Sequence, residues 1–505
     1  MAKIQFGTNN PSTLTSTSPP PAYSPSLSLA NSSKRRSDTA IQPNILFNSI
    51  SALDSSNNTT ATAVQSISAT HIHRIIGVRL PRRSPQKLYD ILLTKGKIAE
   101  VSPHNPRMPS LSHLPGILLG NGRLIAPSLC HAHIHLDKCF LLSDPAYSDL
   151  SIQHGTFDEA MSLTQQAKAR FTHDDLLRRG RRLVLESLRA GVTAMRAFVE
   201  VDATVEMLCL DAGIELQEQF RGLCEIQLCA FAQVPLFSGT DGGDAARKLM
   251  REAAKRGEVA VVGSAPYVEA EEVKARMNVR WLAGLAKGEG KALDFHLDYF
   301  GIERQPMVHD VVSILKSVAW VEQRSDTQPV CLGHCTRLAR WTPAEWRRLK
   351  EQIEEAKLDV SFVGLPTSDL FMMKDKSTLN PVELVRDHQL NAAIAVNNVG
   401  NAFTPQGSCD PITVASLGVG LYSAGTKFDA SLLYNCVSSR AKSAIGLDSI
   451  PSPGLHEGQP ADFVLFGSGE SDWTSPRAVT DVVYNPGAVS NRQIISAGRL
   501  LNFSR

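Results

Sequence analysis

Hydrophobic and polar positions in the middle of the chain predict strand-like and helix-like segments that alternate about eight times. Such alternation favours a parallel sheet wrapped by helices over an antiparallel architecture. Several strand-like segments are continuous apolar runs, which is typical of strands buried on both faces. The predicted strands lie at residues 125–135, 193–199, 226–231, 259–263, 293–298, 330–334, 360–365 and 393–397.

Residues between these strands carry the signals that begin and end helices. Thr342 is a candidate N-cap, with Pro343 at the first helical position and Glu345 at the third, and Gly191 follows an amphipathic run that starts at Asp174. No G-x-G-x-x-G sequence follows the first strand, which disfavours a dinucleotide-binding open sheet. We therefore predict an α/β fold, a (β/α)₈ TIM barrel over residues 127–454.

Shorter β-rich segments flank the predicted barrel on both sides. They lie at residues 73–78, 90–93, 96–101, 461–466, 480–484 and 494–500. Neither group is a convincing domain by itself, so we predict one small composite β-sandwich domain from residues 71–126 and 455–505. Residues 1–70 are rich in Ser, Thr, Asn and Pro without a sustained apolar period, which predicts a disordered leader.

The composition excludes several classes of protein. With 52 basic and 50 acidic residues the chain has no excess of positive charge for nucleic acid, and no apolar run approaches the ~20 residues of a membrane-spanning helix. Nine scattered cysteines are an odd number and do not form a secreted disulfide framework. A cytoplasmic location is predicted, with an organellar one as the alternative because the leader is poor in acidic residues.

The first predicted strand ends in His-Ala-His-Ile-His, residues 131–135. Reactive groups of such barrels cluster where strands end and the following loops begin. Side chains two residues apart on a strand point to the same side, so His133 and His135 can converge on one cation. The alternative is a set of histidines held by hydrogen bonds in a packed turn.

Two further histidines stand at the ends of later strands. His296 ends the fifth strand and can complete the set of metal ligands, and His334 ends the sixth. His334 can hydrogen-bond the attacking water and stabilise the charge that develops on attack. A purely structural role is the alternative for each of them.

These motifs together resemble the amidohydrolase superfamily, and most closely its cytosine deaminase branch. The resemblance covers roughly residues 72–500 and includes the His-x-His motif after residues 125–127, residues 230–233, His296-Leu297-Asp298 and the closing residues 458–464. It implies one zinc or iron ion and water-dependent hydrolysis of a carbon–nitrogen bond, other than a peptide bond, in a nitrogen heterocycle, cyclic amide or amidine. By position, Gln233 is similar to the family's substrate-binding amide.

The chain departs from this family's pattern at two positions. Tyr299 stands where the family has a proton-shuttling glutamate, and Asn397 stands where it has a metal-binding aspartate. Asn397 can offer a carbonyl oxygen to a cation but cannot accept a proton. The catalytic candidates are then His334, Asp298 and Tyr299.

Two hypotheses follow from these departures. The chain is either a hydrolase with rearranged proton transfer or a relative that binds a metal or small ligand without turnover. Deamination, dealkylamination and ring opening all fit the same metal chemistry, so the small-molecule substrate and its leaving group stay open. A homo-oligomer is the commoner state for soluble enzymes of this resemblance.

Overall fold

The computed structural model describes residues 67–107, 114–299, 305–321, 329–373, 375–447, 454–469 and 472–503. The predicted disorder of residues 1–66 lies outside this range. Residues 67–70 were predicted to be part of the leader, and this is wrong. They belong to β1 (Ile67–His71), which pairs antiparallel with β17 (Arg499–Phe503) near the other end of the chain. The sequence partner is over 400 residues away, so the local composition gave no sign of the pairing.

Eight parallel strands form the centre of the molecule, each hydrogen-bonded to the next in chain order. The first and last meet through a bridge between Ile134 and Asn397, which closes the ring. There the amide of His135 donates to the carbonyl of Asn397 over 2.8 Å. The predicted (β/α)₈ barrel is therefore confirmed. Its strands are β7 (Leu129–His135), β8 (Val192–Glu200), β9 (Glu225–Ala232), β10 (Val259–Ser264), β11 (Ala292–Leu297), β12 (Val330–His334), β13 (Val360–Gly364) and β14 (Asn391–Ile394).

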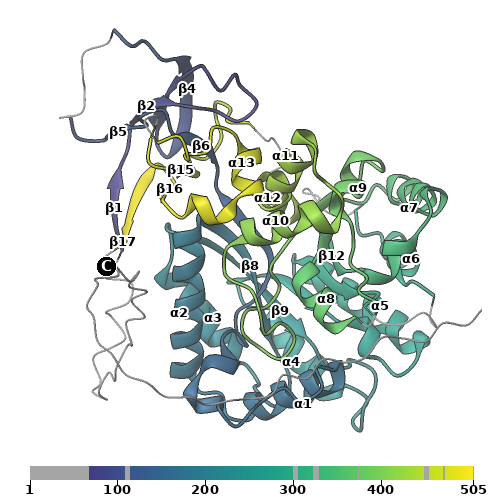
Figure 1. The fold of residues 1–505 in the computed structure, drawn as a ribbon. Helices are drawn as coiled ribbons and strands as arrows, with labels where there is room; N and C mark the ends of the chain where they lie inside the picture. The colour runs from purple at the N-terminus through teal and green to yellow at the C-terminus, as the bar shows by residue number, and fades with distance from the viewer. Residues whose placement is uncertain are drawn as a thin grey trace, which may run out of the picture. The chain divides into compact units, whose positions relative to one another are not determined.

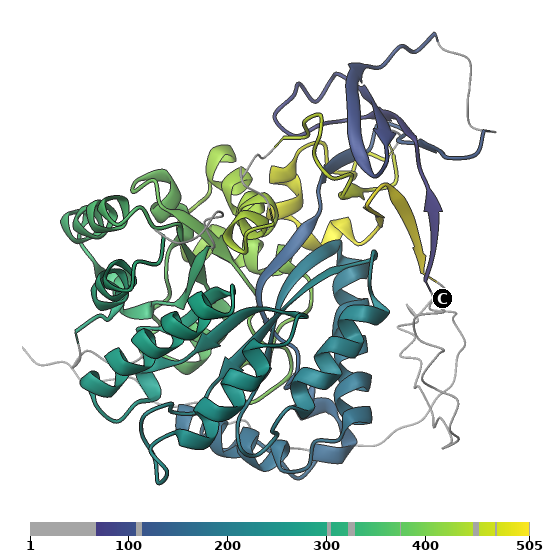
Figure 2. The ribbon, with the colours of Figure 1, turned by 180° about the vertical axis from the view of Figure 1, so that it is seen from behind.

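Helices wrap the outside of these strands, as Figure 2 shows from behind. The capping box of Thr342 and Glu345 begins α7 as predicted, and Gly191 ends α2 with a φ of 103°. A Cβ atom at Gly191 would lie 2.5 Å from Val464 Cγ2, so only glycine fits both the turn and the contact. The principal helices are α1 (Phe157–Lys168), α2 (His173–Ala190), α3 (Leu208–Gln219), α4 (Asp244–Ala254), α5 (Glu272–Gly288), α6 (Val308–Ser317), α7 (Pro343–Glu355), α8 (Pro366–Met372), α9 (Pro381–Arg386), α10 (Pro411–Leu421), α11 (Lys427–Cys436) and α12 (Ser439–Ala444).

Two small sheets stand beside the barrel (Figure 1). One joins strands from both ends of the chain in the order β1-β17-β16-β15-β6, which confirms a composite β-domain, while the exact domain boundaries stay predictions. The other has the order β4-β3-β2-β5. The bounds of these remaining strands are β2 (Arg74–Val78), β3 (Tyr89–Thr94), β4 (Lys97–Pro103), β5 (Ile117–Leu119), β6 (Leu124–Pro127), β15 (Phe463–Phe466) and β16 (Arg492–Ser496).

The segment at residues 480–484 was predicted to be a strand, and this is wrong. It forms α13 (Val479–Tyr484), in which Val482 and Val483 are both buried against the neighbouring helices. The carboxylate of Asp481 accepts hydrogen bonds from the amides of Arg477 and Ala478 at 2.9 and 3.1 Å and so caps the first turn. In five residues an alternating pattern does not separate a strand from one and a half helical turns.

Among the helices that the structure describes, none has both the length and the apolar character that a bilayer crossing requires. All nine cysteines are buried and none forms a disulfide.

Candidate metal centre and active site

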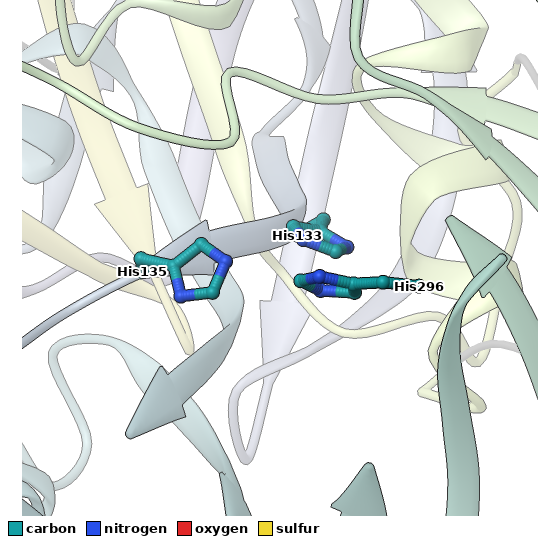
Figure 3. Close-up of side chains that lie close together, drawn as sticks. All are labelled: His133, His135 and His296. Carbon is teal, nitrogen blue, oxygen red and sulfur yellow. The ribbon is translucent and has the colours of Figure 1, made fainter. Parts of the chain in front are cut away.

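Three histidines meet inside the barrel at the carboxyl ends of its strands. His133 and His135 come from β7 and His296 from β11, and all three are buried. One ring nitrogen of each lies within 4.8 Å of those of the other two. In Figure 3 the rings of His133 and His296 lie against each other, 4.5 Å between centroids, with His135 beside them. The structure thus brings the three predicted ligands together.

A strand irregularity keeps a fourth histidine out of this cluster. The register between β7 and β8 shifts between His131 and Ile134, which interrupts the alternation of side chains along β7. His131 points to α2, where its Nε2 is 3.1 Å from the hydroxyl of Ser187. The strand therefore delivers two of its three histidines to the barrel interior.

The donor atoms of the cluster fit a divalent cation. Both ring nitrogens of His133, Nδ1 of His135 and Nε2 of His296 are buried without a hydrogen-bond partner among the described residues. Leaving a buried polar atom unpaired costs about 1–3 kcal/mol, so such atoms signal a ligand. Burial first, and neighbouring cationic groups second, hold the pKa of each imidazole well below its ordinary value. Neutral imidazole is the form that binds zinc or iron.

Asn397 lies beside these histidines because the barrel closes there. Its amide donates to the carbonyl of His133 over 3.2 Å, and its side-chain Nδ2 donates to the hydroxyl of Ser368 over 2.5 Å. The other side-chain atom, Oδ1, is buried and has no partner in the described part of the chain. An amide oxygen is thereby available as a fourth donor.

His334 stands at the end of β12 in a left-handed conformation, with a φ of 67°. Its ring centroid is 5.1 Å from that of His296. Nδ1 of His334 is hydrogen-bonded to Oδ1 of Asp369 over 2.8 Å, and Oδ2 of Asp369 accepts from the hydroxyl of Thr378 at the same distance. Burial raises the pKa of Asp369, and the hydrogen bonds from His334 and Thr378 oppose this. Asp369 thus orients the His334 ring.

The resemblance marks residues 366–373, which contain Asp369, as the place where similar enzymes line their pocket, with a merely structural loop as the alternative, but it gives Asp369 no role of its own. The available signal was its place, five residues after β13, where barrel enzymes carry functional loops.

The carboxylate of Asp298 has a structural role. Its two carboxylate oxygens accept from the amides of Met307 and Val308 at 2.7 and 3.2 Å, at the start of α6. Burial raises the pKa of Asp298 to about 6. The structure gives this carboxylate a capping role, and the catalytic role expected for it stays a prediction.

Tyr299 packs its ring against His334, 4.2 Å between centroids. Burial, followed by the nearby Asp369 and Tyr267, raises the pKa of Tyr299 well above its ordinary value. The phenol therefore stays protonated at neutral pH, as a hydrogen-bond donor rather than a base.

A narrow pocket opens at the histidines. Gln233, Asn397 and Lys138 line it together with His135, His296 and His334. Gln233 lies 3.5 Å from the hydroxyl of Tyr267, and both also line a wider cavity of about 1210 Å³. The expected substrate-binding amide is therefore placed where the narrow pocket meets the wider one.

Lys138 is a pocket residue to which the sequence reasoning gave no role, although it stands three residues after the His-x-His motif. Its ammonium donates to Oε1 of Glu200 over 2.6 Å and lies 5.0 Å from the ring centroid of Phe403. Lys168 donates to the other oxygen of Glu200 over 2.5 Å and also pairs with Asp202. Although burial raises it, the two ammonium groups bring the pKa of Glu200 to about 2.

His135, Asp137 and Glu200 form a second group close enough to hold a cation. However, both oxygens of Glu200 already accept from lysines. Oδ2 of Asp137 accepts from the amide of Glu200 over 2.6 Å, so this group has one unpaired carboxylate oxygen, Oδ1 of Asp137, whereas the three histidines have four unpaired ring nitrogens among the described residues. We therefore assign the cation site to the three histidines.

Comparison with known proteins gives relatives of one kind. No protein-family model matches the chain. N-isopropylammelide isopropyl amidohydrolase of Pseudomonas sp. (strain ADP) is 22% identical over 379 residues, which is 74% of this chain and 86% of that protein. The structure of 5-methylcytosine deaminase from Klebsiella pneumoniae superposes with a TM-score of 0.72 at 21% identity, over 86% of this chain and 98% of the other.

A second solved structure is N-isopropylammelide isopropylaminohydrolase from Burkholderia multivorans, with a TM-score of 0.67 and 23% identity over 85% of this chain and 97% of the other. The barrel with its flanking sheets is the fold that these structures share with the chain. Together with the sequence match along three quarters of its length, this makes the chain similar to the cytosine deaminase-like branch of the amidohydrolase superfamily. The resemblance noted in the sequence is confirmed.

Proposed function

We propose that the protein is a metal-dependent hydrolase that cleaves a carbon–nitrogen bond, other than a peptide bond, in a small nitrogen heterocycle or cyclic amide. The observation that carries the proposal is the set of three buried histidines with unpaired nitrogens at the active end of the barrel. The names of the similar proteins, an isopropyl amidohydrolase and a deaminase, support the reaction class.

The ligands we propose for one zinc or iron ion are His133, His135, His296 and the side-chain oxygen of Asn397. When bound, such an ion lowers the pKa of a water molecule from 15.7 towards ~7 and polarises the carbon under attack. Since Asn397 cannot accept the proton of that water, another residue has to do so.

His334 is the residue that we assign to this task. Asp369 holds its Nδ1, so Nε2 is the nitrogen that remains for the pocket. In our proposal Nε2 accepts the proton of the attacking water and returns it to the leaving amine, while Asp369 stabilises the imidazolium between the two steps. Tyr299 serves as a neutral donor beside it.

Gln233 and Lys138 are proposed to bind the substrate. The amide of Gln233 can donate and accept at once, which suits the N–H and C=O edge of a lactam. The ammonium of Lys138 adds a second donor to the same pocket, and its ion pair with Glu200 keeps it in place.

The second candidate is a relative that binds a metal or small ligand without turnover. One observation favours it: within the described residues, no carboxylate lines the narrow pocket. Loss of a general base or acid slows such reactions by about 10²–10⁴-fold, and both acidic positions of the family pattern are replaced here.

Metal analysis and a substrate screen separate the two candidates. Protein purified without chelators should contain about one equivalent of zinc or iron by elemental analysis, and the His133→Ala/His135→Ala variant should contain none. The metal-loaded protein is then assayed with N-isopropylammelide, cytosine, 5-methylcytosine and guanine for release of ammonia or amine and for ring opening by mass spectrometry. Metal without any product would establish the inert relative, and no metal would exclude the hydrolase.

A cytoplasmic homo-oligomer is part of the proposal. Light scattering of the purified protein tests the oligomeric state, and microscopy of the tagged full-length chain separates the cytoplasm from an organelle.

A further inference from the structure

The donors gathered around the cation site are all neutral. Each of the three imidazoles binds a cation through the lone pair of a ring nitrogen, which only the neutral ring offers. The fourth donor is the amide oxygen of Asn397, which carries no charge. A divalent ion held by these four atoms keeps its full positive charge.

The structure holds Asn397 in this donor role through Ser368. The hydroxyl of Ser368 donates to the carbonyl of Leu365 over 3.3 Å, so its oxygen receives Nδ2 of Asn397 over 2.5 Å. This arrangement fixes which end of the amide is which: the NH₂ group faces Ser368 and the oxygen is left unpaired. Ser368 is therefore a positioning residue for the amide oxygen.

Three buried carboxylates near the site are bound elsewhere. Asp298 caps α6 with both oxygens, Asp369 binds His334 and Thr378, and Glu200 binds two lysines. Asp137 uses Oδ2 for the amide of Glu200, while its Oδ1 is buried without a partner among the described residues, and Asp137 does not line the narrow pocket. Among the described residues, the charged side chain that lines the narrow pocket is instead Lys138.

A divalent charge in a buried pocket beside an ammonium attracts an anion strongly, because Coulomb interactions are several times larger there than in water. Resting on the hydrolase function above, we propose that this site takes a substrate carrying negative charge. Its chemical class is a nitrogen heterocycle that is an anion at neutral pH, such as a ring imide flanked by two carbonyl groups or a ring bearing a carboxylate. A neutral aminopyrimidine is then the poorer ligand.

Anion binding to the cobalt-loaded protein tests this inference without turnover. Azide is the probe, and the visible absorption of Co²⁺ reports its binding. Asn397→Asp supplies the missing negative donor, so the metal Kd should fall about tenfold or more and the azide Kd should rise about tenfold or more. Asn398→Asp is the matched control, because Asn398 lines the same pocket but its side-chain oxygen accepts from Asn401 over 2.8 Å. It should change the azide Kd by less than the Asn397 variant does.

Ser368→Ala gives a second variant should Asn397→Asp fail to fold. Loss of the hydroxyl frees the amide to rotate, so the metal Kd should rise about three- to tenfold while azide still binds the loaded site. Cobalt-loaded wild type that does not bind azide, or equal changes in azide Kd for the two aspartate variants, would overturn the inference.

The two proposals fail in different ways. If azide binds as expected but no heterocycle gives a product, only the proposed hydrolase activity is contradicted. If the protein hydrolyses neutral rings preferentially and azide does not inhibit it, only the proposal of an anionic substrate is contradicted. Under cobalt saturation, a protein that binds no ion removes both.

Discussion

Two buried polar clusters in this barrel have opposite hydrogen-bonding states. The histidines His133, His135 and His296 leave several ring nitrogens without partners in the described structure. Glu269, which follows β10, is as deeply buried, but both of its carboxylate oxygens accept hydrogen bonds. Its oxygens accept from the amides of Leu236 and Phe237, the hydroxyl of Ser238 and the side-chain amide of Asn278, at 2.6 to 3.3 Å.

The difference separates structure from function. A satisfied buried acid fixes a loop, here the connection after β9, because every donor there would otherwise lose its partner. Ring nitrogens that lack a hydrogen-bond partner and lie close together are expected to bind an ion from outside the chain. Tyr299 and Asn397 stand where the cytosine deaminase pattern that the sequence resembles has a glutamate and an aspartate, and Glu269 does not replace these acids, because its oxygens are already engaged.

The largest effect is expected from removing the histidine cluster. His133→Ala with His135→Ala should abolish metal binding and lower hydrolysis by at least ~10⁴-fold, since three neutral nitrogens are needed to hold the ion. Elemental analysis and product release measure both. His131→Ala is the matched control from the same strand: it removes a buried histidine bound to Ser187, so it should lower stability and keep the metal. Metal loss in both variants alike would contradict the comparison.

Glu269→Gln should do the reverse and destabilise the fold while sparing the metal. The substitution removes the negative charge to which four groups now donate hydrogen bonds, and the new NH₂ group faces some of these donors. We expect this to lower the free energy of unfolding by about 2–4 kcal/mol. Denaturant unfolding gives the free energy, and elemental analysis gives the metal content of the folded fraction. A variant of unchanged stability would show that the loop does not depend on this carboxylate.

Asp369→Asn tests a buried acid at the edge of the site, whose carboxylate is fully hydrogen-bonded and orients the proposed catalytic residue His334. We expect kcat to fall about 10–100-fold with metal content unchanged, because His334 loses the partner that sets its orientation. Thr378→Val, which removes only the second hydrogen bond to Asp369, should have a smaller effect.

The double variant with His334→Gln distinguishes positioning from general damage. If Asp369 acts through His334, Asp369→Asn should lower kcat little further once His334 is replaced. Multiplying losses would instead indicate two independent roles.

The smallest expected effect is the change in melting temperature when the metal is removed. A chelator should lower the Tm by a few degrees, because an ion that binds only the native state stabilises it by mass action. Differential scanning with and without added zinc measures the shift. The same shift should appear in Glu269→Gln and vanish in the histidine double variant, and any shift that persists there would place an ion elsewhere.

Local and periodic features were readable in the sequence. The apolar strands, the capping box at Thr342 and Glu345, and the glycine that ends α2 depend on neighbours within a few residues, and the structure confirms them. The His-x-His motif was readable for the same reason, together with the rule that barrel chemistry lies at strand ends. The pattern at residues 480–484 misled because it is too short to set a period.

Tertiary structure alone decided which of the polar residues are free to act. The sequence by itself determined the barrel and supplied histidines at the ends of β7, β11 and β12. It did not show that a bulge turns His131 away, that Asp298 caps α6, or that Asp369 supports His334. Hydrogen bonds between residues from nine to tens of positions apart form only when the chain folds, and they leave several ring nitrogens of the site histidines unpaired among the described residues.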